Sequence, residues 1–250
     1  MSAELGKSMK DHLTPLLAAV ILHAAASFLP APSGAAEPAP VVVELFTSQG
    51  CNSCPPADVV LGELARRDDV LPLSFHITYW DRLGWPDTFG LAASTGRQRD
   101  YADSLGRRGV YTPQMVIGGR IDVVGSQRRR VLEAIELLQS HPEPGPAIAV
   151  AEGALRLTGG APDACSLWLV AFDHARDVAI ERGENRGRTL RYHNVVREIV
   201  GIGDWDGTAL TLPLPLERLA AEQRDGAAVL VQRKADGAIL AARRIDLPPS

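Results

Sequence analysis

The first part of the chain alternates between continuous apolar runs and a segment with helical spacing. Val41–Phe46 is apolar and β-branched apart from Glu44, which is typical of a strand buried on both faces. After a turn, the apolar side chains of residues 57–67 recur at the three- and four-residue spacing of a helix. Val70–Ile77 is again mostly apolar. The pattern predicts a strand, a helix and a parallel second strand joined by a right-handed crossover.

The next segments complete an α/β pattern. Residues 95–105 have apolar positions one helical turn apart and predict a helix. Residues 110–124 contain two short apolar strands around a Gly-Gly turn, which is the signature of a β-hairpin. Residues 126–139 have one apolar face and predict a closing helix. We therefore expect an α/β domain over residues 41–140.

The last hundred residues change to short apolar runs separated by turn residues. Three prolines and a glycine in residues 141–146 predict a domain boundary. Beyond it, helical spacing is weak and is found only in residues 216–222. The predicted strands are residues 147–150, 155–158, 167–172, 178–181, 191–200, 210–212, 229–232 and 239–243. Strands at this spacing predict a β-rich, sandwich-like domain over residues 147–247.

The N-terminal residues have the pattern of an export signal. Lys7 and Lys10 precede the apolar run Leu16–Leu29, and small residues follow as far as Ala36. A membrane anchor is the alternative, but the run is short for a span of roughly 20 residues and contains a histidine. We expect residues 1–36 to be a signal peptide. The mature protein would then be periplasmic or secreted, with no membrane association after cleavage.

The net charge and the distribution of basic residues limit the classes of binding partner that are expected. The 250 residues carry a formal net charge of -4, and the dense basic run Arg128–Arg130 has no aromatic residues interleaved with it. Binding to nucleic acid requires a clustered excess of basic side chains and, for single strands, aromatic stacking groups. No nucleic-acid partner is expected.

Cys51 and Cys54 lie between the first predicted strand and the first predicted helix. The first turn of a helix brings two thiols at this spacing together, and its free N–H groups lower the pKa of a cysteine thiol. In an oxidising compartment such a pair can form a disulfide. We expect Cys51 to be the exposed nucleophile and Cys54 the buried resolving cysteine of thiol–disulfide exchange, with no cofactor.

Two other interpretations of the pair remain open. A cysteine pair in an exported protein is also typical of a permanent structural disulfide. The two reduced thiols would also be ligands for a metal such as copper, with His76 as a third, although no second cysteine pair accompanies them. The third cysteine, Cys165, opens an apolar run and is expected to be a buried thiol.

The order of an apolar strand, the Cys51–Cys54 motif and Thr112-Pro113 before the Gly-Gly turn resembles the thioredoxin fold. The resemblance implies a cis bond at Pro113, facing the cysteines, and a Thr112 backbone that pairs with a bound substrate chain. A trans proline at the start of a strand is the alternative.

Glu44 is a carboxylate inside an apolar strand, where burial is costly and raises the pKa of an acid. In thioredoxin-like proteins an acidic residue beneath the cysteines accepts or relays protons, and the resemblance implies this role for Glu44 toward Cys54. The alternative is a solvated Glu44 on a partly exposed strand. The segment after the second strand is longer than that fold requires, and we expect His76 and Trp80 to border the cysteine site.

Several further strings are similar to those of a family of exported bacterial proteins, domain of unknown function 1223. The strings are Thr47–Asp58, Tyr79–Asp81, Tyr111–Gln114, Glu184-Asn185-x-Gly187 and Tyr192–Val196. The resemblance extends from about Val41 to the C-terminus, and the family has no established reaction. The expected function therefore rests on the cysteines: exchange with protein thiols or disulfides and with an unidentified redox partner, in a direction that the sequence does not indicate.

Overall fold

A computed structural model describes residues 39–160 and 163–247, so the predicted signal peptide lies outside the described residues. In the described part, no helix has the length and apolar character needed to span a membrane. The helices are α1 (Pro55–Leu64), α2 (Ala92–Ser104), α3 (Arg128–Ser140) and α4 (Leu216–Ala221), with a 3-10 helix at Asp81–Leu83.

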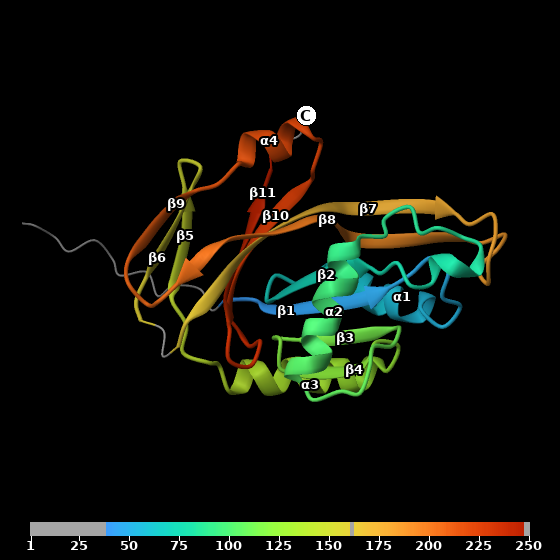
Figure 1. Ribbon diagram of the computed structural model, residues 1–250, viewed down its shortest axis with the longest axis horizontal. Helices are drawn as coiled ribbons and strands as arrows, with labels where there is room; N and C mark the ends of the chain where they lie inside the picture. Colours follow the sequence, from blue (N-terminus) through green and yellow to red (C-terminus); the bar gives the residue numbers. More distant parts are fainter. Residues whose placement is uncertain (1–38, 161–162, 248–250) are drawn as a thin grey trace, which may run out of the picture. The chain divides into compact units, whose positions relative to one another are not determined.

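An eight-stranded mixed sheet and a smaller three-stranded sheet form the β-structure (Figure 1). The order in the large sheet is β11 (Ile239–Asp246), β10 (Gly226–Arg233), β7 (Cys165–Ala179), β8 (Thr189–Trp205), β2 (Val70–His76), β1 (Val41–Thr47), β3 (Gln114–Ile117) and β4 (Ile121–Val124). The order in the small sheet is β5 (Ala147–Ala151), β6 (Ala154–Thr158) and β9 (Leu210–Pro213). The predicted combination of an α/β part with a β-rich part is confirmed at this level.

β1 is buried on both faces, which explains its continuous apolar sequence. Val43 and Leu45 pack with apolar side chains of α1 and α3, whereas Val42 and Phe46 pack with Tyr101 of α2. β1 pairs in parallel with β2, as a helical crossover requires, and antiparallel with β3, which forms the hairpin with β4. α1 and α3 therefore cover one face of this part of the sheet and α2 covers the other, and the β1–α1 turn follows the carboxyl end of β1.

The large sheet continues past the boundary expected in residues 141–146. β8 pairs in parallel with β2 through Ser74 and Val195, and β7 and β10 extend the same sheet. By their internal contacts, residues 39–160 and 163–247 belong to one compact unit. The small sheet packs on the part of the large sheet that contains β7 and β10. The contact is an apolar cluster that includes Leu155, Leu169 and Val229.

The strands predicted at residues 167–172 and 178–181 belong to one strand, β7. The polar residues between them are paired across the hairpin instead of forming a turn: Arg191 of β8 makes an ion pair with Asp177 at 3.1 Å. The resulting β7–β8 hairpin is long enough to carry its tip, residues 180–188, to the cysteine motif. Ile180, at the start of the tip, belongs to an apolar cluster against which Phe89, which follows β2, packs.

Candidate functional site

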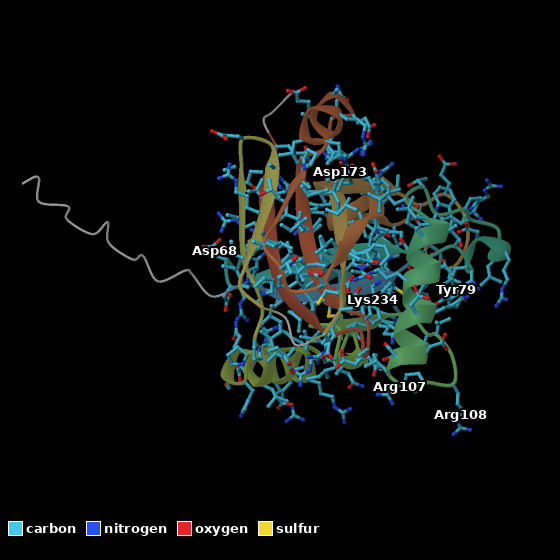
Figure 2. All side chains as sticks on the ribbon, turned by 60° about the vertical axis from the view of Figure 1, so that its left-hand side comes forward. Asp68, Tyr79, Arg107, Arg108, Asp173 and Lys234 are labelled. Atoms are coloured by element: carbon cyan, nitrogen blue, oxygen red, sulfur yellow. A yellow bond between two sulfur atoms is a disulfide. The ribbon has the colours of Figure 1, made fainter. Side chains whose placement is uncertain are left out.

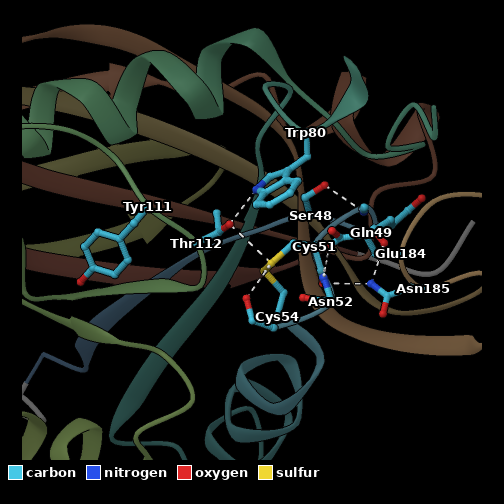
Figure 3. Close-up of a disulfide and its surroundings, with 12 residues drawn as sticks. Ser48, Gln49, Cys51, Asn52, Cys54, Trp80, Tyr111, Thr112, Glu184 and Asn185 are labelled. Carbon is cyan, nitrogen blue, oxygen red and sulfur yellow. Dashed lines mark hydrogen bonds between the residues drawn. A yellow bond between two sulfur atoms is a disulfide. The ribbon is translucent and has the colours of Figure 1, made fainter. Parts of the chain in front are cut away.

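Cys51 and Cys54 form a disulfide at the start of α1 (Figure 3). Cys54 is the N-cap of the helix, and prolines occupy its first turn, where the missing N–H groups would have no partner within the helix. The chain turns tightly before the helix, since Cys54 N donates to Cys51 O at 3.2 Å. This turn brings together two side chains that are three positions apart.

Both cysteines are buried, with 0% of each residue exposed. The prediction that Cys51 is exposed is therefore wrong for the oxidised protein. The Thr112 hydroxyl donates to Cys51 Sγ at 3.5 Å, and the Ser53 hydroxyl lies 3.3 Å from the same sulfur. Trp80 Nε1 donates to Thr112 Oγ1 at 2.8 Å, so the indole is tied to the group that contacts the disulfide. Figure 3 shows Trp80 and Thr112 beside the sulfur atoms.

Thr112 and Trp80 thus border the disulfide, as the sequence predicted for Trp80. The Thr112–Pro113 peptide bond is cis, as the resemblance implied, and Pro113 is buried. The neighbouring Tyr111 points away from the sulfur atoms, and its hydroxyl donates to Asp122 at 2.9 Å (Figure 3). The loop before β3 therefore directs the Thr112 side chain toward the disulfide and the Tyr111 side chain away from it.

The prediction for Glu44 is corrected, because its carboxylate lies on the other face of the sheet. Arg97 of α2 donates to it through Nε at 2.6 Å and Nη2 at 3.2 Å, and the Tyr101 hydroxyl donates as well. Side chains alternate along a strand, so Glu44 faces α2, whereas Val43 and Leu45 face the helix that carries Cys54. The ion pair explains how a carboxylate is buried in an apolar strand without serving the cysteines.

A buried acid that sequence reasoning missed lies on the cysteine side: Asp58. It follows Cys54 by four positions in α1, a spacing that places two side chains on one face of a helix. Neither of its carboxylate oxygens has a hydrogen-bond partner among the described residues. Burial raises the pKa of Asp58 to about 7, with the nearby His76 acting in the opposite direction. An acid four positions after Cys54, among the apolar residues at the start of the predicted helix, was the available signal.

His76 is fully buried and joins the cysteine loop through other residues. Its Nδ1 lies 2.8 Å from Asp87 Oδ2, which also accepts from Gln49 N at 2.8 Å. Although burial opposes it, the charge and hydrogen bond of His76, with backbone N–H groups, hold the pKa of Asp87 below its ordinary value. The ring packs edge-on against Phe89 and Tyr192. His76 therefore supports the turn before Cys51, and no hydrogen bond joins it to the sulfur atoms among the described residues.

The hairpin tip completes the site from a segment 134 residues away along the chain. Asn185 is fully buried, and its Nδ2 donates to Gln49 O and Cys51 O, both at 2.9 Å. Arg188 holds the Asn185 oxygen at 2.9 Å. Glu184 Oε2 accepts from Asn52 N at 3.2 Å. These contacts give a role to the Glu184-Asn185 string, for which the sequence alone indicated none.

The third cysteine takes no part in the disulfide, and no group of metal ligands surrounds the cysteine pair in the described residues. Cys165 is a buried free thiol, as predicted, and burial raises its pKa. Within residues 39–160 and 163–247, no three side chains of His, Cys, Asp or Glu are grouped as ligands for a metal ion. In that part of the chain, no further metal ligand is grouped with Cys51 and Cys54 to support the interpretation as a copper site.

A groove of about 330 Å³ lies on the side of Thr112 to which Tyr111 points. Arg108, Val124 and Arg130 also line it. Figure 2 shows Arg108 projecting outward from the loop after α2. A larger cavity of about 640 Å³ lies between the start of β1, the end of α3 and β11, and its lining includes no residue of the disulfide site.

Comparisons with known proteins place the chain near others whose reaction is not described. A family model with the description "Protein of unknown function (DUF1223)" matches residues 42–232. The crystal structure of protein AGR_C_4864 from Agrobacterium tumefaciens is similar at 32% identity and a TM-score of 0.72, over 84% of this chain and 95% of that one. HBP35 of Porphyromonas gingivalis is similar in fold, with a TM-score of 0.54 and 12% identity over 84% of this chain and 75% of that one. No curated protein matches the chain.

Proposed function

The chain belongs to the DUF1223 family of proteins of unknown function, and we propose that it is an exported, thioredoxin-like thiol–disulfide oxidoreductase. The observation that carries the proposal is the Cys51–Cys54 disulfide at the start of α1, with the Thr112 hydroxyl 3.5 Å from Cys51 Sγ. A helix start and a nearby hydroxyl donor both favour a thiolate at Cys51 once the pair is reduced. The proposed compartment is the periplasm or the exterior, where such a pair can be oxidised.

The proposed reaction transfers two electrons between the pair and a protein substrate. In the direction that reduces the substrate, the Cys51 thiolate attacks a substrate disulfide; a bond forms between the two sulfurs, and the second substrate sulfur leaves as a thiolate. The Cys54 thiolate then attacks Cys51 Sγ, which restores the protein disulfide and releases the first substrate sulfur as a thiolate. The reverse sequence oxidises a substrate dithiol. A separate thiol or disulfide redox partner returns the pair to its starting state.

Asp58 is the group we propose to receive the Cys54 proton. Cys54 must lose its proton before it can attack the mixed disulfide, and the helical spacing places Asp58 on its face of α1. The Asp58 pKa of about 7, raised by burial, suits proton exchange near neutral pH. The substrate chain would lie along Thr112, with Trp80, which donates to the Thr112 hydroxyl, as one border.

A non-catalytic binding protein with a structural disulfide is the second candidate. The complete burial of Cys51 and Cys54 favours it, because an exchange catalyst needs an accessible sulfur. The two candidates differ in what happens to the pair in the presence of a reductant. A catalytic pair is readily reduced and then reacts with other disulfides, whereas a structural disulfide resists reduction.

Trapping of the mixed disulfide tests the proposed function. In a Cys54→Ser variant, which also carries Cys165→Ser to remove the third thiol, Cys51 can attack a disulfide but cannot be released by its partner. We expect a glutathione-capped peptide to leave a stable adduct on Cys51, on the order of tenfold more abundant than on the wild type, as measured by intact mass. The matched control is Cys51→Ser with Cys165→Ser, which should form little adduct. The absence of adduct on Cys51 would support the structural-disulfide candidate.

A further inference from the structure

The hairpin tip places one negative charge next to the reactive cysteine. Asn185 fixes the tip, because it is fully buried and donates to the carbonyl groups of Gln49 and Cys51. Gly183 packs close to Trp85, since a Cβ atom at this glycine would lie 3.2 Å from the Trp85 Cβ. With the tip held in this way, the side chain of Glu184 reaches the peptide that follows Cys51.

The Glu184 carboxylate accepts a hydrogen bond from a backbone N–H group that would otherwise favour a thiolate at Cys51. Asn52 N, the first N–H after Cys51, donates to Glu184 Oε2 at 3.2 Å. Free N–H groups before a helix and positive charges lower the pKa of a cysteine thiol, whereas a nearby negative charge raises it. Glu184 thus acts against the hydroxyl groups of Ser53 and Thr112, which approach Cys51 Sγ.

We propose that Glu184 tunes the redox poise of the Cys51–Cys54 pair: its carboxylate disfavours the Cys51 thiolate and so makes the pair a weaker oxidant. The reduced form of a pair is stabilised by a stable thiolate, and a stabilised reduced form makes a strong oxidant. Removal of the charge should therefore make the pair more oxidising. The inference rests on the proposed function, because it assigns a residue that adjusts the redox potential of the same exchanging pair.

Other charged groups also surround the cysteine loop and must be distinguished from Glu184. Asp58 of α1, Asp87 after β2 and His76 of β2 are buried, and Arg188 of the tip holds Asn185. Glu184 differs from the buried acids because it is solvent-exposed. Its influence should therefore be screened by salt, whereas that of the buried groups should persist.

The experiment measures the pKa of the Cys51 thiol in the reduced protein from the pH dependence of its alkylation by iodoacetamide. Glu184→Gln keeps an acceptor for the Asn52 N–H but removes the charge. We expect this variant to lower the pKa by about half a unit to one unit at low ionic strength, and by much less in 1 M salt. The equilibrium with glutathione should shift about three- to tenfold toward the reduced pair, which corresponds to about 15 to 30 mV.

Two variants serve as controls. Glu181→Gln removes the same charge from the same exposed tip, and Glu184→Asp retains the charge; both should stay close to the wild type. Equal pKa values in Glu184→Gln and Glu181→Gln would overturn the inference. The pKa of the thiol is measured without a substrate, so its shift can be observed even if the wild type catalyses no exchange, in which case only the proposed function fails.

Discussion

Replacement of Cys51 with serine is expected to abolish thiol–disulfide exchange, with a loss on the order of a thousandfold or more. A serine hydroxyl is not ionised near neutral pH and cannot form a disulfide, so neither the first attack nor the mixed disulfide is possible. The fold should persist. Closing a four-residue loop contributes only about 2 kcal/mol to the free energy of unfolding in the chain-entropy description.

The measurement compares exchange rates and unfolding free energies for Cys51→Ser and for Cys165→Ser. Cys165→Ser removes a buried thiol far from the disulfide in sequence and should retain the wild-type rate. The structural-disulfide candidate predicts a different pattern, in which the wild type itself has no measurable exchange and Cys51→Ser changes stability alone. Retained exchange in Cys51→Ser would show that another group is the nucleophile.

Replacement of Asp58 with asparagine is expected to stabilise the protein at alkaline pH by up to about 4 kcal/mol relative to its effect in acid. The pKa of Asp58 is raised from 3.8 to about 7 by burial, so the folded state binds a proton that the unfolded state releases. Below about pH 4 the acid is protonated in both states. As the pH rises from about 4 to 7, the unfolded state gains the free energy of ionisation and the wild type loses stability. Asparagine does not ionise and escapes this loss.

Urea unfolding of the oxidised proteins between pH 4 and 8.5 measures this difference. An unsatisfied amide in place of Asp58 adds a cost that does not depend on pH, so the informative quantity is how the difference between variant and wild type changes with pH. Asp68→Asn, in the exposed loop after α1, is the matched control and should show a flat difference (Figure 2). A flat difference for Asp58→Asn as well would contradict the assignment. In the thiol–disulfide exchange assay, Asp58→Asn should slow the attack of Cys54 on the mixed disulfide.

The elements that local sequence determines were predicted well. β1, α1 and β2 follow from apolar spacing over a few residues, and the β3–β4 hairpin follows from its Gly-Gly turn. The disulfide follows from two cysteines at the start of a helix. Each of these features depends on residues that are near one another along the chain.

The features that the sequence did not indicate depend on distant segments or on the face of a strand. Burial of Cys51 results partly from Asn185, 134 residues away, whose position depends on the length of the β7–β8 hairpin. Charged residues along β7 divided the strand in the sequence pattern because a partner such as Arg191, which pairs with Asp177, lies on the neighbouring strand of the hairpin. The face of β1 on which Glu44 lies could have been predicted from the sequence, since strict alternation with Val43 and Leu45 assigns it to the face opposite Cys54.

The reduction potential of the Cys51–Cys54 pair is the most direct test of thiol–disulfide exchange as the function of this protein. It can be determined by equilibrating the protein without residues 1–36 with glutathione or dithiothreitol buffers and trapping the free thiols. The account predicts a value between about -120 and -270 mV, the range of exchange catalysts. A value below about -300 mV, typical of structural disulfides, would contradict it and favour the binding protein.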